Sequence, residues 1–412
     1  MKPVIFFTGI ILISLAPVSR AADFTWSGLG GTAEFGNGNN WVGGSAPSHT
    51  AEHNYVFTGS SNTTVMLSST TNGPIILNLT FDQNAGSFDL KPTAFSLSGN
   101  RFRLKSDAAV AIIQNSPNDQ RISATLSQSG NTGNAPVAIT GTGTGSLTLD
   151  SLRFGASGTQ TNVLNIDRNV NIGTITRVTS DAPDASLVFN VASGATAAVT
   201  GTMAGTTTDT ATAFTLVKSG AGKLVLSGQN LSTGAVNVTG GTLLVNGYKS
   251  NGSGALAVSS STTLGGTGTV GGATTIYGNL KAGDGGVGLL TFENTLALNA
   301  GSNSIFHING LTRGTGHDAI NVQGEVAFGG TLTLNFGFAA QVDQEFDLFD
   351  FNNAIGDFDS VSFVNGGYEG TFDVTTGVLR LTAVPEPGAT ALLAVVGTLS
   401  LARRSRRQGF TK

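Results

Sequence analysis

The chain has no cysteine, and charged residues make up only 11% of its 412 positions. The missing cysteines exclude disulfides, thiolate metal sites and cysteine nucleophiles. The charged fraction is less than half of the quarter or so that is usual for soluble domains. Stability must therefore come from backbone hydrogen bonds and repeated apolar packing.

Basic residues are especially scarce in the body of the chain. Between residues 23 and 382 there are 14 Lys and Arg against 24 Asp and Glu, which gives a formal charge of about −10. This sign argues against nucleic acid as a partner. Disorder is not expected either, because 39% of the chain is apolar and disordered chains combine low hydrophobicity with high net charge. The 58 glycines instead favour many short strands joined by tight turns.

The first 22 residues have the pattern of a secretory signal peptide. Lys2 precedes a mostly apolar stretch from Val4 to Leu15, and the small residues Ser19 and Ala21 follow at the positions that signal peptidase needs. Signal peptidase is therefore expected to cut between Ala21 and Ala22. An uncleaved anchor is the alternative, but the apolar stretch is only 12 residues long, which is short for a membrane span.

The last segment, residues 383–412, combines an apolar run with a basic end. The run from Gly388 to Ala402 has 15 residues and would measure about 22 Å as a helix. This is a marginal length for a transmembrane helix, since a bilayer core is about 30 Å thick. The arginines that follow would hold the end of the chain on the cytoplasmic side; they are Arg403, Arg404, Arg406 and Arg407.

This end of the chain resembles a PEP-CTERM sorting signal. The resemblance rests on Val384-Pro385-Glu386-Pro387, the short apolar helix and the arginine cluster, in that order. It implies a partner of the exosortase type, which would remove the helix and basic tail and pass the body to the cell surface or extracellular matrix. A permanent tail anchor after a proline-rich linker is the alternative interpretation.

The body, residues 23–382, is predicted to be all-β. Alternating apolar and polar residues recur in runs of four to seven, such as "KLVLSG" from Lys223 and "TLTLNFG" from Thr331. The runs also resemble one another: "GSLTL" at Gly145 matches "GKLVL" at Gly222, and "GGTLLVNG" matches "GGTLTLNFG". Leu224 and Leu243 lie 19 positions apart, which is the spacing of one coil of a β-solenoid.

Residues 217–247 contain the clearest repeat and resemble the autotransporter-associated β-strand repeat. A looser likeness extends over most of the body, including the opening segment with Trp26 and Trp41. The resemblance implies a right-handed parallel β-helix. Periodicity alone would not separate this fold from a β-sandwich.

Residues that could carry chemistry are few, and no cofactor is expected. On a helix, His49 and His53 would lie on one face, where they could bind a metal ion. The preceding "APS" instead favours a loop. His307 is expected to point outward from a strand, and His317-Asp318 to form a turn. Arg101, Arg103 and Lys105 would share one strand face, where they could meet an acidic glycan or simply face solvent.

An acidic cluster near the end of the body is a weak candidate for calcium. Neither known calcium-loop spacing is matched, and solvent-facing acids on an edge strand would explain the pattern equally well. The candidate ligands are Asp343, Glu345, Asp347 and Asp350, with Asp357 and Asp359 nearby.

These observations predict an exported bacterial surface or matrix protein, namely a non-enzymatic structural or adhesive β-solenoid that could contact extracellular polysaccharide. The alternative is a β-helix polysaccharide lyase or glycoside hydrolase. Such an enzyme needs carboxylates, or carboxylates with basic groups, gathered on one face. The basic residues of the body are instead scattered along the sequence.

Overall fold

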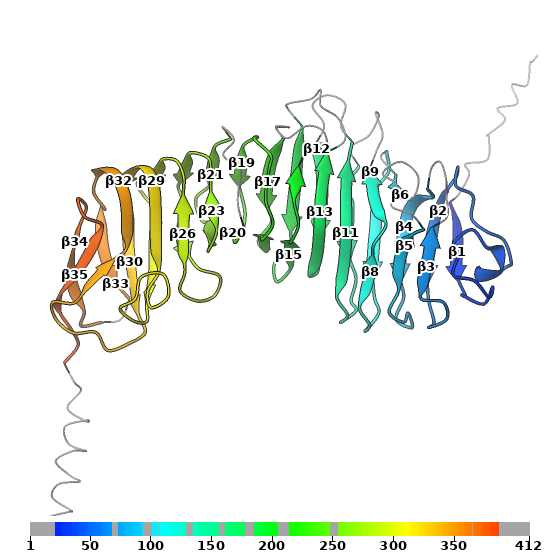
Figure 1. The fold of residues 1–412 in the computed structure, drawn as a ribbon, viewed down its shortest axis with the longest axis horizontal. Coiled ribbons are helices and arrows are strands. Elements are labelled where there is room, and N and C mark those ends of the chain that lie inside the picture. The colour runs from blue at the N-terminus through cyan, green and yellow to red at the C-terminus, as the bar shows by residue number, and fades with distance from the viewer. Residues whose placement is uncertain are drawn as a thin grey trace, which may run out of the picture.

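A computed structural model describes residues 21–67, 73–93, 101–105, 107–128, 135–155, 161–177, 185–204, 214–247, 254–364 and 366–386. Within these ranges the chain is an all-β parallel solenoid, drawn out along one axis (Figure 1). Its strands pair with the strands of the next coil and form three ladders, here called A, B and C. The predicted all-β parallel solenoid is thereby confirmed, while the right-handed sense of the coil and the two terminal helices stay predictions.

Ladder A runs from the first coil to the last. Its strands are β1 (Ala22–Trp26), β2 (Glu52–Phe57), β4 (Ile75–Phe81), β7 (Val110–Gln114), β10 (Val137–Thr140), β12 (Thr161–Ile166), β14 (Ser186–Val191), β17 (Thr215–Ser219), β19 (Val236–Val238), β21 (Leu256–Val258), β24 (Thr274–Ile276), β27 (Leu296–Leu298), β29 (Ala319–Phe328) and β32 (Phe349–Gly356).

Ladder B is equally continuous. Its strands are β3 (Thr64–Leu67), β5 (Asp89–Pro92), β8 (Gln120–Ile122), β11 (Leu147–Phe154), β13 (Val170–Arg177), β15 (Thr196–Val199), β18 (Lys223–Leu226), β20 (Thr242–Val245), β22 (Thr263–Gly266), β25 (Asn279–Ala282), β28 (Asn303–Ile308), β30 (Thr331–Phe336) and β33 (Ser360–Phe363).

Ladder C is described in two stretches. The first contains β6 (Arg101–Leu104), β9 (Thr125–Gln128), the second halves of β11 and β13, and β16 (Met203–Ala204); the second contains β23 (Thr269–Val270), β26 (Leu289–Phe292) and the first halves of β29 and β32.

The core is a set of stacked columns of inward side chains. Leu224 pairs with Leu243 on the next coil, as the spacing of 19 predicted, and Leu243 pairs with Leu264 in turn. All three are fully buried, and each such burial stabilises the fold by about 1.5–3 kcal/mol. The four segments that resemble one another in sequence all lie on ladder B, in β11, β18, β20 and β30.

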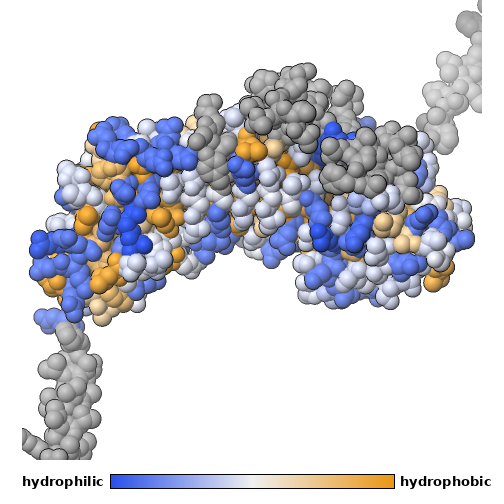
Figure 2. All heavy atoms as spheres, viewed as in Figure 1, coloured by the Kyte–Doolittle hydropathy of each residue, from blue (hydrophilic) through white to orange (hydrophobic). Residues whose placement is uncertain are grey.

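Coil length varies along the axis. Partner residues on ladder A are 33 positions apart between β4 and β7, but 20 apart between β17 and β19 and 18 apart between β21 and β24. The body is correspondingly slimmer in its middle than at its two ends (Figure 2). The surface of the slim part is mostly pale in Figure 2, which marks residues of intermediate hydropathy.

The amino-terminal end of the solenoid is closed by aromatic packing. Trp26 and Trp41 are buried and meet edge-to-face at 5.1 Å. The outer edge of β1 is covered by the segment around the short helix η1 (Gly38–Asn40), because Val42 N–H donates to the Thr25 carbonyl. The opening segment with Trp26 and Trp41 is therefore a cap on an otherwise exposed strand edge.

The carboxyl-terminal end is closed differently, by a three-stranded antiparallel sheet. Its strands are β31 (Glu345–Asp347), β34 (Glu369–Asp373) and β35 (Val378–Ala383), in the order β31-β35-β34. Phe346, Leu379 and Leu381 from this sheet are fully buried in the core. Figure 1 shows it beyond the last parallel strands.

The predicted sorting segments lie mostly outside the described residues. This holds for the signal helix, for the apolar run 388–402, for Pro387 and for the four arginines. Of the described residues, Ala22 opens β1, Val384 packs against the core, and Pro385 and Glu386 follow β35. In the part of the chain that the structure describes, no helix is long and apolar enough to cross a membrane.

His53, which lies inside the first coils, should make the folded protein less stable in acid. It lies on β2, is 7% exposed, and neither ring nitrogen has a hydrogen-bond partner. Burial lowers its pKa below the ordinary 6.5, so the unfolded chain binds the proton more readily than the folded chain. The contribution of neutral His53 to the free energy of unfolding is therefore complete above about pH 6.5. It is lost as the pH falls toward the pKa of His53 in the folded protein.

Replacing His53 by leucine should reduce this acid-dependent loss. We expect a smaller fall in melting temperature between pH 7 and pH 5 for His53→Leu than for the wild type, measured by circular dichroism. Equal falls in the two proteins would contradict the prediction.

Candidate functional site

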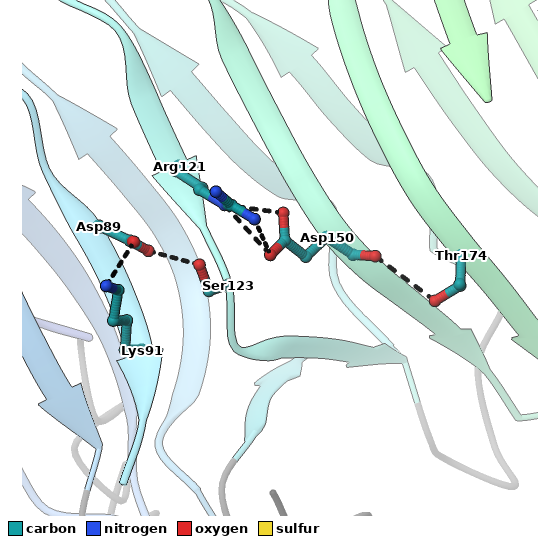
Figure 3. Close-up of polar contacts among 6 residues, drawn as sticks. All are labelled: Asp89, Lys91, Arg121, Ser123, Asp150 and Thr174. Carbon is teal, nitrogen blue, oxygen red and sulfur yellow. Dashed lines mark hydrogen bonds and ion pairs between the residues drawn. The ribbon is translucent and has the colours of Figure 1, made fainter. Parts of the chain in front are cut away.

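Charged side chains gather on the outer surface of ladder B, near its amino-terminal end. Figure 3 shows Asp89 and Lys91 on β5, Arg121 on β8, and Asp150 on β11. These positions face outward because their neighbours in each strand point into the core. The polar alternation of the sequence thus becomes a band across successive coils.

Within this band the charges are already paired with one another. The Arg121 guanidinium donates to both carboxylate oxygens of Asp150, at 2.8–3.1 Å. This contact raises the pKa of Arg121 above its usual range. Ser123 Oγ donates to Asp89, whose other oxygen lies 3.2 Å from Lys91 Nζ. Such exposed pairs contribute about 0.2–1 kcal/mol each. The Arg121–Asp150 pair joins neighbouring coils, whereas Asp89 and Lys91 lie on the same strand.

A polar cleft of about 670 Å³ lies beside this band, in the turns that lead into ladder B. Arg168 occupies it and donates to the backbone carbonyls of Gln114 and Gly145 from two earlier coils. Asp119 accepts from Ser146 N–H at 2.8 Å, which lowers the pKa of its carboxyl. The cleft, here called the Arg168 cleft, therefore has a fixed wall of hydrogen-bonded turns.

A second, smaller hollow of about 320 Å³ lies farther along the same ladder, over β18, β20, β22 and β25. We call it the Gly265 groove. Thr196 of the Arg168 cleft pairs with Lys223 of the Gly265 groove on the neighbouring strand. The two hollows are thus consecutive along ladder B, on a scale that suits small ligands or segments of a polymer.

Neither hollow is lined by the carboxyl pair on which glycoside hydrolysis depends. Asp119 is the acid of the Arg168 cleft, and Asp284 is the acid of the Gly265 groove. Among the described residues, a raised carboxyl pKa is found at Asp318, where burial is the main cause. Asp318 is fully buried, so it has no access to a substrate in either hollow.

The weak calcium candidates are not gathered around one point. Asp343 pairs with Arg380 at 2.8 Å, and Asp347 pairs with Arg313 at 3.1 Å. Glu345 and Asp350 are exposed on β31 and β32. No three His, Asp or Glu side chains within the described ranges are placed to hold a metal ion. The edge-strand interpretation fits β31, which lies at the edge of its antiparallel sheet.

The histidines follow the sequence interpretation only in part. His307 points outward between buried Phe306 and Ile308, as predicted. The loop interpretation of His53 was wrong, because His53 lies inside the solenoid on β2. His317 directly follows a turn at residues 314–316, close to the predicted turn. Its side chain is buried, with Nδ1 3.1 Å from the Gly310 carbonyl oxygen and Nε2 3.3 Å from the Asp347 carbonyl oxygen.

The basic strand face at residues 101–105 is mostly engaged in tertiary contacts. Arg103 donates to the carbonyls of Gly73 and His49. Lys105 forms ion pairs with Glu52 and Asp107. Burial lowers the pKa of Arg103. These side chains join the first coils together and leave little of this face for an acidic glycan.

Two fully buried charged residues, Lys218 and Asp318, were missed by the sequence reasoning. Lys218 lies on β17, is fully buried, and donates to the carbonyls of Ser219, Gly220 and Gly240. Asp318 accepts from the N–H groups of Gly288 and His307 and lies 3.1 Å from His307 Nδ1. Lys218 occupies an inward position of an alternating strand, which was the one signal that could have revealed it.

Comparison with known families identifies one segment of the body. Residues 216–245 match the model of the passenger-associated-transport-repeat, which is the autotransporter-associated β-strand repeat. This segment runs from β17 to β20 and contains the Lys218 site. No curated protein matches the chain. A repeat of this family within a parallel solenoid fits an exported or surface β-helix protein.

Proposed function

We propose that the protein is a non-enzymatic structural or adhesive solenoid of the bacterial cell surface or extracellular matrix. Signal peptidase would remove residues 1–21, and a PEP-CTERM signal at residues 383–412 would direct the body through an exosortase-type enzyme. The two-capped parallel solenoid is the observation that carries this proposal. A long repetitive body with closed ends is suited to extending a binding surface away from the cell.

The outer surface of ladder B supports a binding role. Its hydroxyl, amide and paired charged groups offer weak polar contacts to a ligand over several coils. Neither hollow on this ladder is lined by two acids in the described structure. Adhesion through repeated weak contacts therefore fits this surface better than bond cleavage.

The sorting part of the proposal is tested by neutralising the basic tail. Changing Arg403, Arg404, Arg406 and Arg407 to glutamine removes the cytoplasmic retention charge and should lower the surface fraction roughly tenfold. The surface and membrane fractions are compared by immunoblotting of the full chain in its native cells. Arg380→Gln is the matched control, since Arg380 lies on β35 outside the signal. An unchanged surface fraction in the tail variant would contradict the proposal.

A further inference from the structure

The Gly265 groove is built from two neighbouring rows of outward side chains on ladder B. One row runs from Lys223 through Thr242 and Thr263. The other runs from Leu244 through Gly265 to Lys281. The two lysines therefore lie at opposite ends of the groove, three strands apart. At the usual strand spacing their backbones are separated by about 14 Å along the axis.

A glycine-rich turn forms the far wall of the groove. After β25 the chain folds back, so that Gly266 and Gly283 bond through both their N–H groups, at 3.1 and 2.8 Å. A Cβ at Gly265 would lie only 2.5 Å from the Lys281 carbonyl oxygen. The floor is therefore free of a side chain at Gly265, and Leu244 beside it is only 5% exposed. The hollow is a consequence of this backbone packing.

The charges of the groove are not balanced. Asp284 accepts from Asn246 Nδ2 at 3.0 Å and lies 3.9 Å from Lys223 Nζ, a loose ion pair. Lys281 has no hydrogen-bond or ion-pair partner among the described residues. One acid thus faces two ammonium groups, whereas the acids and bases of the band in Figure 3 pair with one another. Lys281 is thus a cationic donor available to a ligand in a concave site, as polar groups in binding hollows are.

We propose that the Gly265 groove binds an acidic polysaccharide through its uronate residues. Lys223 and Lys281 would each bind one carboxylate of the polymer, and Thr242 and Thr263 would hydrogen-bond the sugar hydroxyls between them. The inference rests on the proposed surface location, because only there would the groove meet extracellular polysaccharide.

The acidic body does not prevent this binding. The body carries a formal charge of about −10 over residues 23–382. At physiological ionic strength, charges beyond about 8 Å are largely screened. The two lysines and Asp284 therefore determine the local potential of the groove, which is positive on balance. Binding of a polyanion should weaken as salt is added.

The test is a titration of the purified full chain in mild detergent, followed by isothermal calorimetry. The probes are oligogalacturonate, a neutral cello-oligosaccharide of equal length, and polyphosphate of similar charge. We expect oligogalacturonate to bind at least about tenfold more tightly than either other probe. The double variant Lys223→Glu/Lys281→Glu should lose at least about tenfold of that affinity, and Lys223→Arg/Lys281→Arg should keep it.

Lys91→Glu is the matched control. Its side chain is 44% exposed on ladder B, against 45% for Lys223. An equal loss in Lys91→Glu, equal binding of polyphosphate, or no oligogalacturonate binding would each overturn the inference. The surface fraction measured with the tail variants is independent of these titrations, so the two proposals can fail separately.

Discussion

Changing Lys218 to alanine is expected to destabilise the middle of the solenoid by about 3 kcal/mol. The ammonium group is fully buried and donates to three backbone carbonyls at 2.8–2.9 Å. Its removal leaves buried acceptors without a donor, each costing about 1 kcal/mol or more, and opens a cavity where the stem lay. The repeat that matches the known family would lose its most buried charged contact.

Local stability is the quantity to measure, because a solenoid can unfold coil by coil. Hydrogen exchange followed by mass spectrometry should show faster exchange in peptides from residues 215–245 of Lys218→Ala. Lys223→Ala is the control in the same repeat, since Lys223 is exposed and its removal should change stability by about 0.5 kcal/mol at most. Equal protection in the wild type and Lys218→Ala would contradict the structural role.

Lys218 should also make the folded protein more stable as the pH rises into the alkaline range. Burial lowers the pKa of Lys218 to about 8, whereas the unfolded value is about 10.4. Between these values the unfolded chain binds more protons than the folded chain, so stability increases with pH. The gain attributable to Lys218 between pH 7 and pH 9.5 is about 2 kcal/mol. The Lys218→Met variant should lack this gain in stability. Hydrogen exchange, corrected for the intrinsic exchange rates at each pH, can measure the difference.

Changing Asp318 to alanine is expected to cost about 4 kcal/mol near the carboxyl-terminal end. Its carboxylate accepts from Gly288 N–H and His307 N–H, both at 2.8 Å, and it is fully buried. The substitution leaves two buried donors without acceptors, at about 1–3 kcal/mol each. Because Gly288 precedes β26 and Asp318 precedes β29, the loss would loosen two successive coils.

The Asp318→Asn substitution removes the negative charge but keeps the size and shape of the side chain. The amide keeps one acceptor oxygen but turns an N–H group toward a backbone donor, so we expect about half of the alanine effect. Asp350→Ala is the control, because Asp350 is exposed on β32. Melting temperature and hydrogen exchange over residues 288–328 report both effects. A loss in Asp350→Ala as large as in Asp318→Ala would show that the buried contacts do not matter.

The repeating part of the fold could be predicted from the sequence because it depends on local periodicity. Leu224 and Leu243 are stacked by alternation and coil length, which are both visible along the chain. The buried charges could not be predicted in this way. The Gly240 carbonyl that binds Lys218 and the Gly288 N–H that binds Asp318 come from turns that only the coiling brings close.

The candidate hollows were beyond the reach of the sequence for a related reason. The Arg168 cleft exists because Arg168 bonds to Gln114, which is 54 positions away. The Gly265 groove depends on Gly283 folding back to Gly266. Glycine patterns indicated turns at these places but not which turns face each other. Outward alternation correctly placed His307, whereas the inward position of His53 was not recognised.

The central claim is that the body is exported and sorted, and the termini of the mature protein test it most directly. The protein would be isolated from the surface fraction of its native cells, and both ends determined by mass spectrometry. We expect an amino terminus at Ala22 and a last residue between Val384 and Pro387. Peptides that retain Leu401 to Lys412, found only in the membrane fraction, would contradict sorting and indicate a permanent tail anchor.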